Sequence, residues 1–158
     1  MNQTVVIATV ALIAHVLAAV VWVGGMFFAL LVLRPATGAL DAVPRLILWR
    51  QVLERFFGWV IVAIVLLLLS GYGMVFGVFG GFRGIGLHVQ IMQGTGILMM
   101  LLFFHLYFAP WRRFKTALTR RDNALAARQL NQIRWIVTAN LILGLITVAV
   151  GGSGRYWG

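Results

Sequence analysis

The chain has 158 residues, of which 62% are hydrophobic and 10% are charged, whereas soluble domains carry about 25% charged residues. One soluble core of this size cannot bury so much apolar surface, so the composition excludes an ordinary water-soluble domain and predicts a membrane protein. The chain has no cysteine, which excludes disulfides, thiolate metal sites, iron–sulfur clusters and covalently attached c-type haem.

Four apolar segments follow one another along the chain, each close to or above the roughly 20 residues that cross a bilayer as a helix. They cover about residues 5–33, 56–79, 85–109 and 133–150. We therefore expect an all-α fold, an integral membrane four-helix bundle made by a single transmembrane domain over residues 1–158.

Most of the net charge of +10 lies in two of the three connections between these segments. The first carries Arg34, Arg45, Arg50 and Arg55, and the third carries seven Arg or Lys residues between 112 and 134. Because positive residues concentrate on the cytoplasmic side, both connections should be cytoplasmic and both termini should be outside, which is an N-out/C-out topology. This placement favours a multi-pass protein of a bacterial inner membrane over a nucleic-acid-binding protein.

Residues 112–134 combine many arginines with scattered leucines, which predicts a cytoplasmic interfacial helix between the third and fourth spans. Five tryptophans lie close to the expected membrane edges, as in an aromatic belt. They are Trp49, Trp59, Trp111, Trp135 and Trp157.

Ionisable residues inside a membrane are costly, so each is a functional candidate. Three histidines qualify: His15 in the first span, and His88 and His105 near opposite ends of the third. On the third span, Met92, Thr95 and Met99 follow on the face of His88, whereas Gln90 shares the opposite face with His105. His15 has small residues and Trp22 at helical spacing, which would leave room for a flat or bulky ligand.

His15 is closer in depth to His88 and Gln90 than to His105, because the first and third spans run in the same direction. Two histidines from different helices can ligate haem iron on both faces, and helix bundles hold cofactors in this way. The same imidazoles, with methionine thioethers, would also suit copper. Simple packing is the alternative for each of these residues. For the fourth span, where small and polar residues share a stripe with Asn140 and Gly144, packing is favoured.

Short motifs resemble the CopD-type copper-resistance membrane domains and the related HemJ-type protoporphyrinogen oxidases. The first helix carries His15, Trp22 and Gly25 at a similar spacing, and the segments 52–56, 87–90 and 111–114 are similar to helix ends in HemJ-type proteins. Residues 133–144 resemble the last helix of CopD-type domains. The resemblance implies a four-helix membrane bundle that binds b-type haem or handles copper. In HemJ-type proteins a lysine of the third helix works with the histidine of the first, and Gln90 stands at that lysine position here.

The leading hypothesis is a membrane-embedded b-type haem redox protein, with iron held by His15 and His88 near the outer leaflet and with Trp22, Gln90 and His105 near the cofactor. Whether such a protein is also a haem-dependent oxidoreductase, acting on a porphyrinogen or a quinol, is left open by the sequence. The alternative is a copper transport or tolerance protein that binds Cu(I) through His15, His88, Met92 and Met99. A third hypothesis is a membrane scaffold whose histidines only pack. Expected partners are the lipid bilayer and a quinol, a porphyrin or a periplasmic redox or copper protein, and a homo-oligomer is compatible with all three.

Overall fold

The computed structural model describes residues 3–156, and every regular element in this range is a helix. In chain order these are α1 (Gln3–Phe27), the π-helix η1 (Phe28–Leu33), α2 (Arg34–Ala36), the 3-10 helix η2 (Thr37–Ala39), α3 (Ala42–Gly77), α4 (Leu87–Phe108), α5 (Pro110–Thr119), α6 (Asn123–Ser153) and the 3-10 helix η3 (Gly154–Tyr156). They join into four rods, each long and apolar enough to cross a membrane, over Gln3–Ala39, Ala42–Gly77, Leu87–Thr119 and Asn123–Ser153. This confirms the all-α prediction with four spans.

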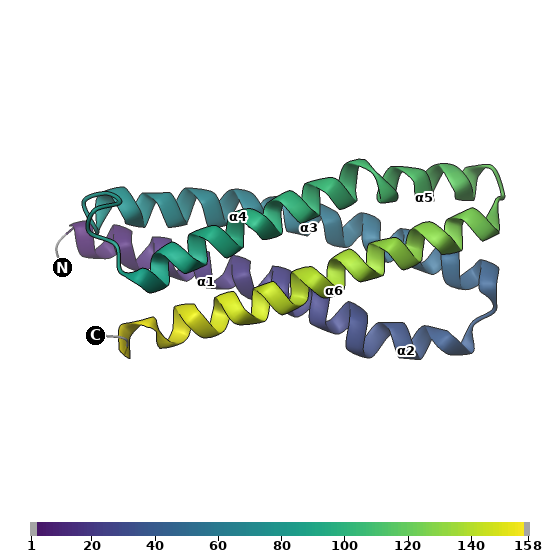
Figure 1. Cartoon of the computed structure of the whole chain (residues 1–158), viewed down its shortest axis with the longest axis horizontal. Helices are drawn as coiled ribbons and strands as arrows, with labels where there is room; N and C mark the ends of the chain where they lie inside the picture. Colours follow the sequence, from purple (N-terminus) through teal and green to yellow (C-terminus); the bar gives the residue numbers. More distant parts are fainter. Residues whose placement is uncertain (1–2, 157–158) are drawn as a thin grey trace.

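The four rods lie roughly along one axis and run alternately in opposite directions (Figure 1). α1 packs along α3, while α4 and α5 pack along α6, and contacts between α1 and α6 join the two pairs. Both described ends of the chain and the connection between α3 and α4 lie at one end of the bundle. The two arginine-rich turns lie at the other end, which agrees with the predicted grouping of the connections (Figure 1).

The outer surface of the bundle is apolar, as a lipid-facing surface must be. Large hydrophobic side chains such as Ile7 and Leu69, each 69% exposed, and Leu101 and Phe108, each 61% exposed, point away from the core. A soluble monomer rarely exposes contiguous apolar patches of this extent. The exposed side chains and the length of the helices therefore place the chain in a bilayer as a multi-pass protein.

An aromatic cluster fills the space between the two helix pairs near the middle of the bundle. Phe57 of α3 is 1% exposed and meets the rings of Phe103, Tyr107 and Trp111 edge-on, at centroid distances of 5.6, 6.3 and 5.2 Å. Edge-to-face pairs of this kind add stability beyond the area that they bury. The cluster joins α3 to α4 and α5, so it fixes how the two pairs sit against each other.

The connections end the helices by recognisable local chemistry. Between α3 and α4, Gly80 and Gly81 have φ values of 67° and 106°, which glycine adopts without steric cost. At the opposite end, the carboxylate of Asp122 accepts a hydrogen bond of 2.9 Å from the Leu125 N–H and caps α6. Pro110 begins α5 directly after Ala109, so α5 continues in nearly the direction of α4 (Figure 1).

The expected interfacial helix over residues 112–134 takes a different form. The segment is divided between α5 and the first turns of α6, which pack against each other as an antiparallel hairpin. Leu130 and Ile133, two apolar residues of this segment, are 3% and 1% exposed in the core. The physical reason is that their apolar faces meet the neighbouring helix, which buries them more completely than an interfacial position would.

The aromatic belt is also smaller than expected. Trp59 and Trp135 are 63% and 71% exposed, as residues of an aromatic belt would be. Trp49 and Trp111, however, are each 2% exposed, because α3 and α5 continue past the predicted membrane edge and bury them between helices. Trp157 lies outside the described residues.

Candidate functional site

His15 lies on the side of α1 that faces α3, where its ring is half-buried. Its Nδ1 is 2.9 Å from the Ser70 hydroxyl, and that hydroxyl also donates a hydrogen bond to the Leu66 carbonyl. A serine hydroxyl has one hydrogen, so Ser70 accepts from His15 Nδ1–H while it donates to the carbonyl. In the neutral imidazole this leaves Nε2 without a hydrogen, free to accept a proton or bind a metal ion.

A close approach of the helix backbone allows this contact. Gly71 of α3 follows Ser70, and a Cβ at that position would lie 3.2 Å from His15 Cε1. The missing side chain therefore lets the imidazole approach the backbone of α3 closely. His15 is thus oriented by α3 rather than by α4.

His88, in the first turn of α4, faces the carboxyl end of α6. Its ring packs against Gly154 and Gly86, where a Cβ at Gly86 would come within 2.9 Å of His88 Nδ1. The ring is half-buried between these two glycines. The contact fixes His88 at the end of the bundle that holds both described termini.

Two methionines of α4 continue the line from His88 along α6. A Cβ on Gly151 would lie 3.1 Å from Met92 Sδ, and a Cβ on Gly144 would lie 3.1 Å from Met99 Cε. Met99 is buried, whereas Met92 is half-buried. The face predicted for His88, Met92 and Met99 therefore points at the small-residue stripe of α6. We call this line of contacts the α4/α6 seam.

Polar side chains hold the seam together between these contacts. The hydroxyls of Thr95 and Thr147 are 2.7 Å apart, and the Asn140 amide donates a hydrogen bond of 3.1 Å to the Met99 carbonyl. Asn140 is 2% exposed, and its Oδ1 has no partner among the described residues. Hydrogen bonds of this kind stabilise helix pairs in membranes, so part of the seam is structural.

The other predicted site residues lie away from the seam. Trp22 is 2% exposed and packs edge-on against Phe103 at 6.2 Å, as part of the core. Gln90 is exposed and lies with Gln93 at an open depression on α4, where Gln93 donates to the Tyr72 hydroxyl over 3.4 Å. His105 is exposed on the face of α4 that points away from α6.

The structure therefore separates residues that the sequence placed together. His15 turns toward α3 and His88 toward α6, so their rings do not face one cavity, and this arrangement does not support haem ligation by the pair. Within residues 3–156, no three His, Cys, Asp or Glu side chains gather as a metal cluster. The seam, by contrast, brings one imidazole and two thioether side chains into line.

Sequence reasoning missed the partners of these side chains. Ser70 is a polar residue within the second apolar span, but nothing in the sequence pairs it with His15. The glycines of α6 and the methionines of α4 each formed a visible stripe with helical spacing. Their contact depends on how the two helices are rotated, which single-sequence periodicity does not give.

Comparison with known proteins adds an independent result. A scan against protein families matches residues 50–153 to the family described as copper resistance protein D, CopD. The matched range includes His88, Met92 and Met99, whereas His15 and Trp22 precede it. No curated protein and no solved structure gives a significant match. The HemJ-type part of the resemblance stays a prediction. Because the match covers most of the chain, which is all-helical with four spans, the chain belongs to the CopD family.

Proposed function

We propose that this chain handles copper in a bacterial inner membrane and that the α4/α6 seam provides the ligands for Cu(I). Imidazole and thioether groups are soft, neutral donors that suit this ion. Cysteine, the other soft donor in proteins, is absent from the chain. Family membership supports copper as the cargo, and the alignment of His88 with Met92 and Met99 along one seam is the observation that supports the site.

The spacing of the donors suits transfer better than storage. His88 and Met92 are one helical turn apart, about 6 Å along the axis, and Met99 lies about 10 Å deeper. Such a row offers few donors at each point, and transport requires sites that bind an ion weakly enough to release it. We therefore infer that His88 and Met92 capture the ion at the end of the bundle and that Met99 follows along the seam.

Haem b, the leading hypothesis from the sequence, is the second candidate for the group that this protein binds. It would require His15 and His88 to leave their positions against α3 and α6 and meet around one porphyrin. An absorbance scan of protein expressed with ample haem separates the two ideas. A Soret band that disappears in His15→Ala would restore the haem proposal.

The copper proposal is tested by growth on copper and by metal analysis of the purified protein. Expression of the wild-type chain should shift the copper concentration that halves growth, and His88→Ala with Met92→Leu should abolish the shift. His105→Ala is the matched control, because His105 is exposed on the opposite face of α4. An unchanged shift in the double variant rejects the seam, and no shift with the wild-type chain rejects copper handling. A separate His15→Ala variant shows whether the imidazole beside Ser70 takes part.

A further inference from the structure

Three arginines from three elements lie within electrostatic reach of one another at the arginine-rich end of the bundle. They are Arg34 of α2, Arg45 of α3 and Arg134 of α6, and the positive charges of Arg34 and Arg45 repel that of Arg134. Among the described residues, no carboxylate lies within the 4.0 Å of an ion pair with any of them. The chain has three acids in all, so this concentration of positive charge is left uncompensated by protein.

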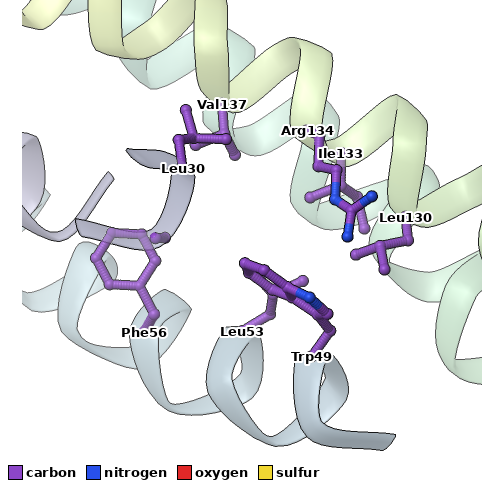
Figure 2. Close-up of a pocket in the computed structure, with 9 residues that line it drawn as sticks. Leu30, Trp49, Leu53, Phe56, Leu130, Ile133, Arg134 and Val137 are labelled. Carbon is purple, nitrogen blue, oxygen red and sulfur yellow. The ribbon is translucent and has the colours of Figure 1, made fainter. Parts of the chain in front are cut away.

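Arg134 is partly enclosed by the protein. Its Nε is buried and has no hydrogen-bond partner among the described residues. The guanidinium carbon lies 5.4 Å from the centre of the Trp49 ring, and Figure 2 shows the side chain reaching toward that ring. The aromatic face stabilises the cation but cannot accept the N–H hydrogen bonds that a guanidinium offers.

A chain of hydrogen bonds fixes the position of Trp49 and links it to Arg34. Trp49 Nε1 donates to the Thr37 hydroxyl over 3.3 Å, and that hydroxyl donates to the Arg34 carbonyl over 2.9 Å. Trp49 and Thr37 are 2% and 3% exposed. The backbone that carries Arg34 is therefore held in a defined place beside the ring on which Arg134 rests.

Arg134 borders a small, partly open cleft of about 10 Å³ with apolar walls. Leu30 of η1, Phe56 of α3 and Val137 of α6 line it on three sides (Figure 2). Trp135, the neighbour of Arg134, is 71% exposed as an interfacial tryptophan would be. Positive charge and exposed apolar surface thus adjoin each other at this end of the bundle.

We propose that Arg34, Arg45 and Arg134 bind the phosphate of an anionic phospholipid whose acyl chains lie on the apolar outer surface of the bundle. Arginine forms paired hydrogen bonds with phosphate, which would satisfy the guanidinium of Arg134. Basic pockets between membrane helices on the cytoplasmic side recognise lipid headgroups by this chemistry. The apolar outer surface of the bundle favours a lipid over free phosphate. This site lies at the opposite end from the copper seam and does not depend on the proposed function.

The test uses the full chain, purified in detergent and stripped of lipid. Phosphatidylglycerol, phosphatidylcholine or inorganic phosphate is then added, and bound lipid is counted by native mass spectrometry while the melting temperature is followed. The wild-type protein should retain phosphatidylglycerol in preference to phosphatidylcholine. Arg134→Gln should weaken retention about fivefold, the effect expected for loss of one arginine near an anionic membrane surface.

Two further variants make the result decisive. Arg34→Gln changes an exposed residue, so it should preserve the fold while weakening retention to a similar extent. Arg128→Gln, an exposed arginine on the same helix as Arg134, is the matched control and should bind as the wild-type chain does. Equal loss in all three variants would reduce the effect to net charge and overturn the site. Stabilisation by inorganic phosphate equal to that by phosphatidylglycerol would overturn the lipid assignment.

Discussion

Gly25 of α1 shows how a single missing side chain determines the packing of two helices. A Cβ at this position would overlap the end of the Phe56 ring of α3. We expect Gly25→Ala to cost about 1–3 kcal/mol, the usual penalty for overpacking, and to lower the melting temperature in detergent. Gly24 is the matched control, because a Cβ there would meet nothing within 4 Å.

Gly24→Ala should be neutral or slightly stabilising, since alanine is a better helix former than glycine. The two neighbouring glycines have opposite expectations only if α1 is rotated as described. If both substitutions lower the melting temperature equally, the contact between Gly25 and Phe56 is not the one that forms in the membrane.

The free-energy cost of placing an ionisable side chain in a membrane identified the candidate functional residues, but it did not identify their partners. His15 and His88 stand out in the sequence because an imidazole is expensive in lipid. Their hydrogen bonds and contacts depend on which side of each helix faces which neighbour. Hydropathy gives little help here, because lipid and protein interior are both apolar and all faces of a span look alike. The pairing of His15 with Ser70 therefore required the structure.

At the scale of elements, Asn140 is the clearest link between α4 and α6. Its amide donates to the Met99 carbonyl, and it is almost fully buried. We expect Asn140→Ala to destabilise the protein by about 0.6–1.7 kcal/mol, from the average to the maximum measured for hydrogen bonds between membrane helices. Thermal unfolding in detergent measures this effect.

Asn131→Ala is the control for that prediction. Asn131 lies on the same helix, is exposed and makes none of the described contacts with α4. Its substitution should leave the melting temperature almost unchanged. If Asn131→Ala and Asn140→Ala behave alike, the hydrogen bond to Met99 contributes nothing measurable to the seam.

The existence of the four long helices could be predicted from apolar length, but their full extent could not. α3 has 36 residues and is about 54 Å long at 1.5 Å per residue, whereas the hydrocarbon core is about 30 Å thick. A hydropathy pattern reports the part in lipid and misses helical turns beyond it. For this reason Trp49 and Trp111 were assigned to the membrane edge, although both are buried between helices that continue into the arginine-rich end.

At the scale of the whole molecule, charge and architecture agree on two distinct ends. The first turn of α4, which carries His88, and the connection between α3 and α4 lie at one end, and the arginine-rich turns lie at the other (Figure 1). A copper ion would enter the seam at the first end, while an anionic headgroup would bind at the second. The orientation of the bundle decides which side of the membrane each proposed site faces. The distribution of arginine predicts an N-out/C-out orientation.

The absence of cysteine from the chain makes this orientation simple to measure, because any introduced thiol is the only one. We expect Arg83→Cys, in the connection between α3 and α4, to react with a membrane-impermeant maleimide in intact cells. Arg120→Cys, at the turn between α5 and α6, should react only after permeabilisation. Both positions are exposed on the protein surface. A difference in their reaction with the maleimide therefore reports the side of the membrane on which each lies. The reverse pattern would place the arginine cluster outside, where positive residues are not favoured, and would turn the His88 end of the seam toward the cytoplasm.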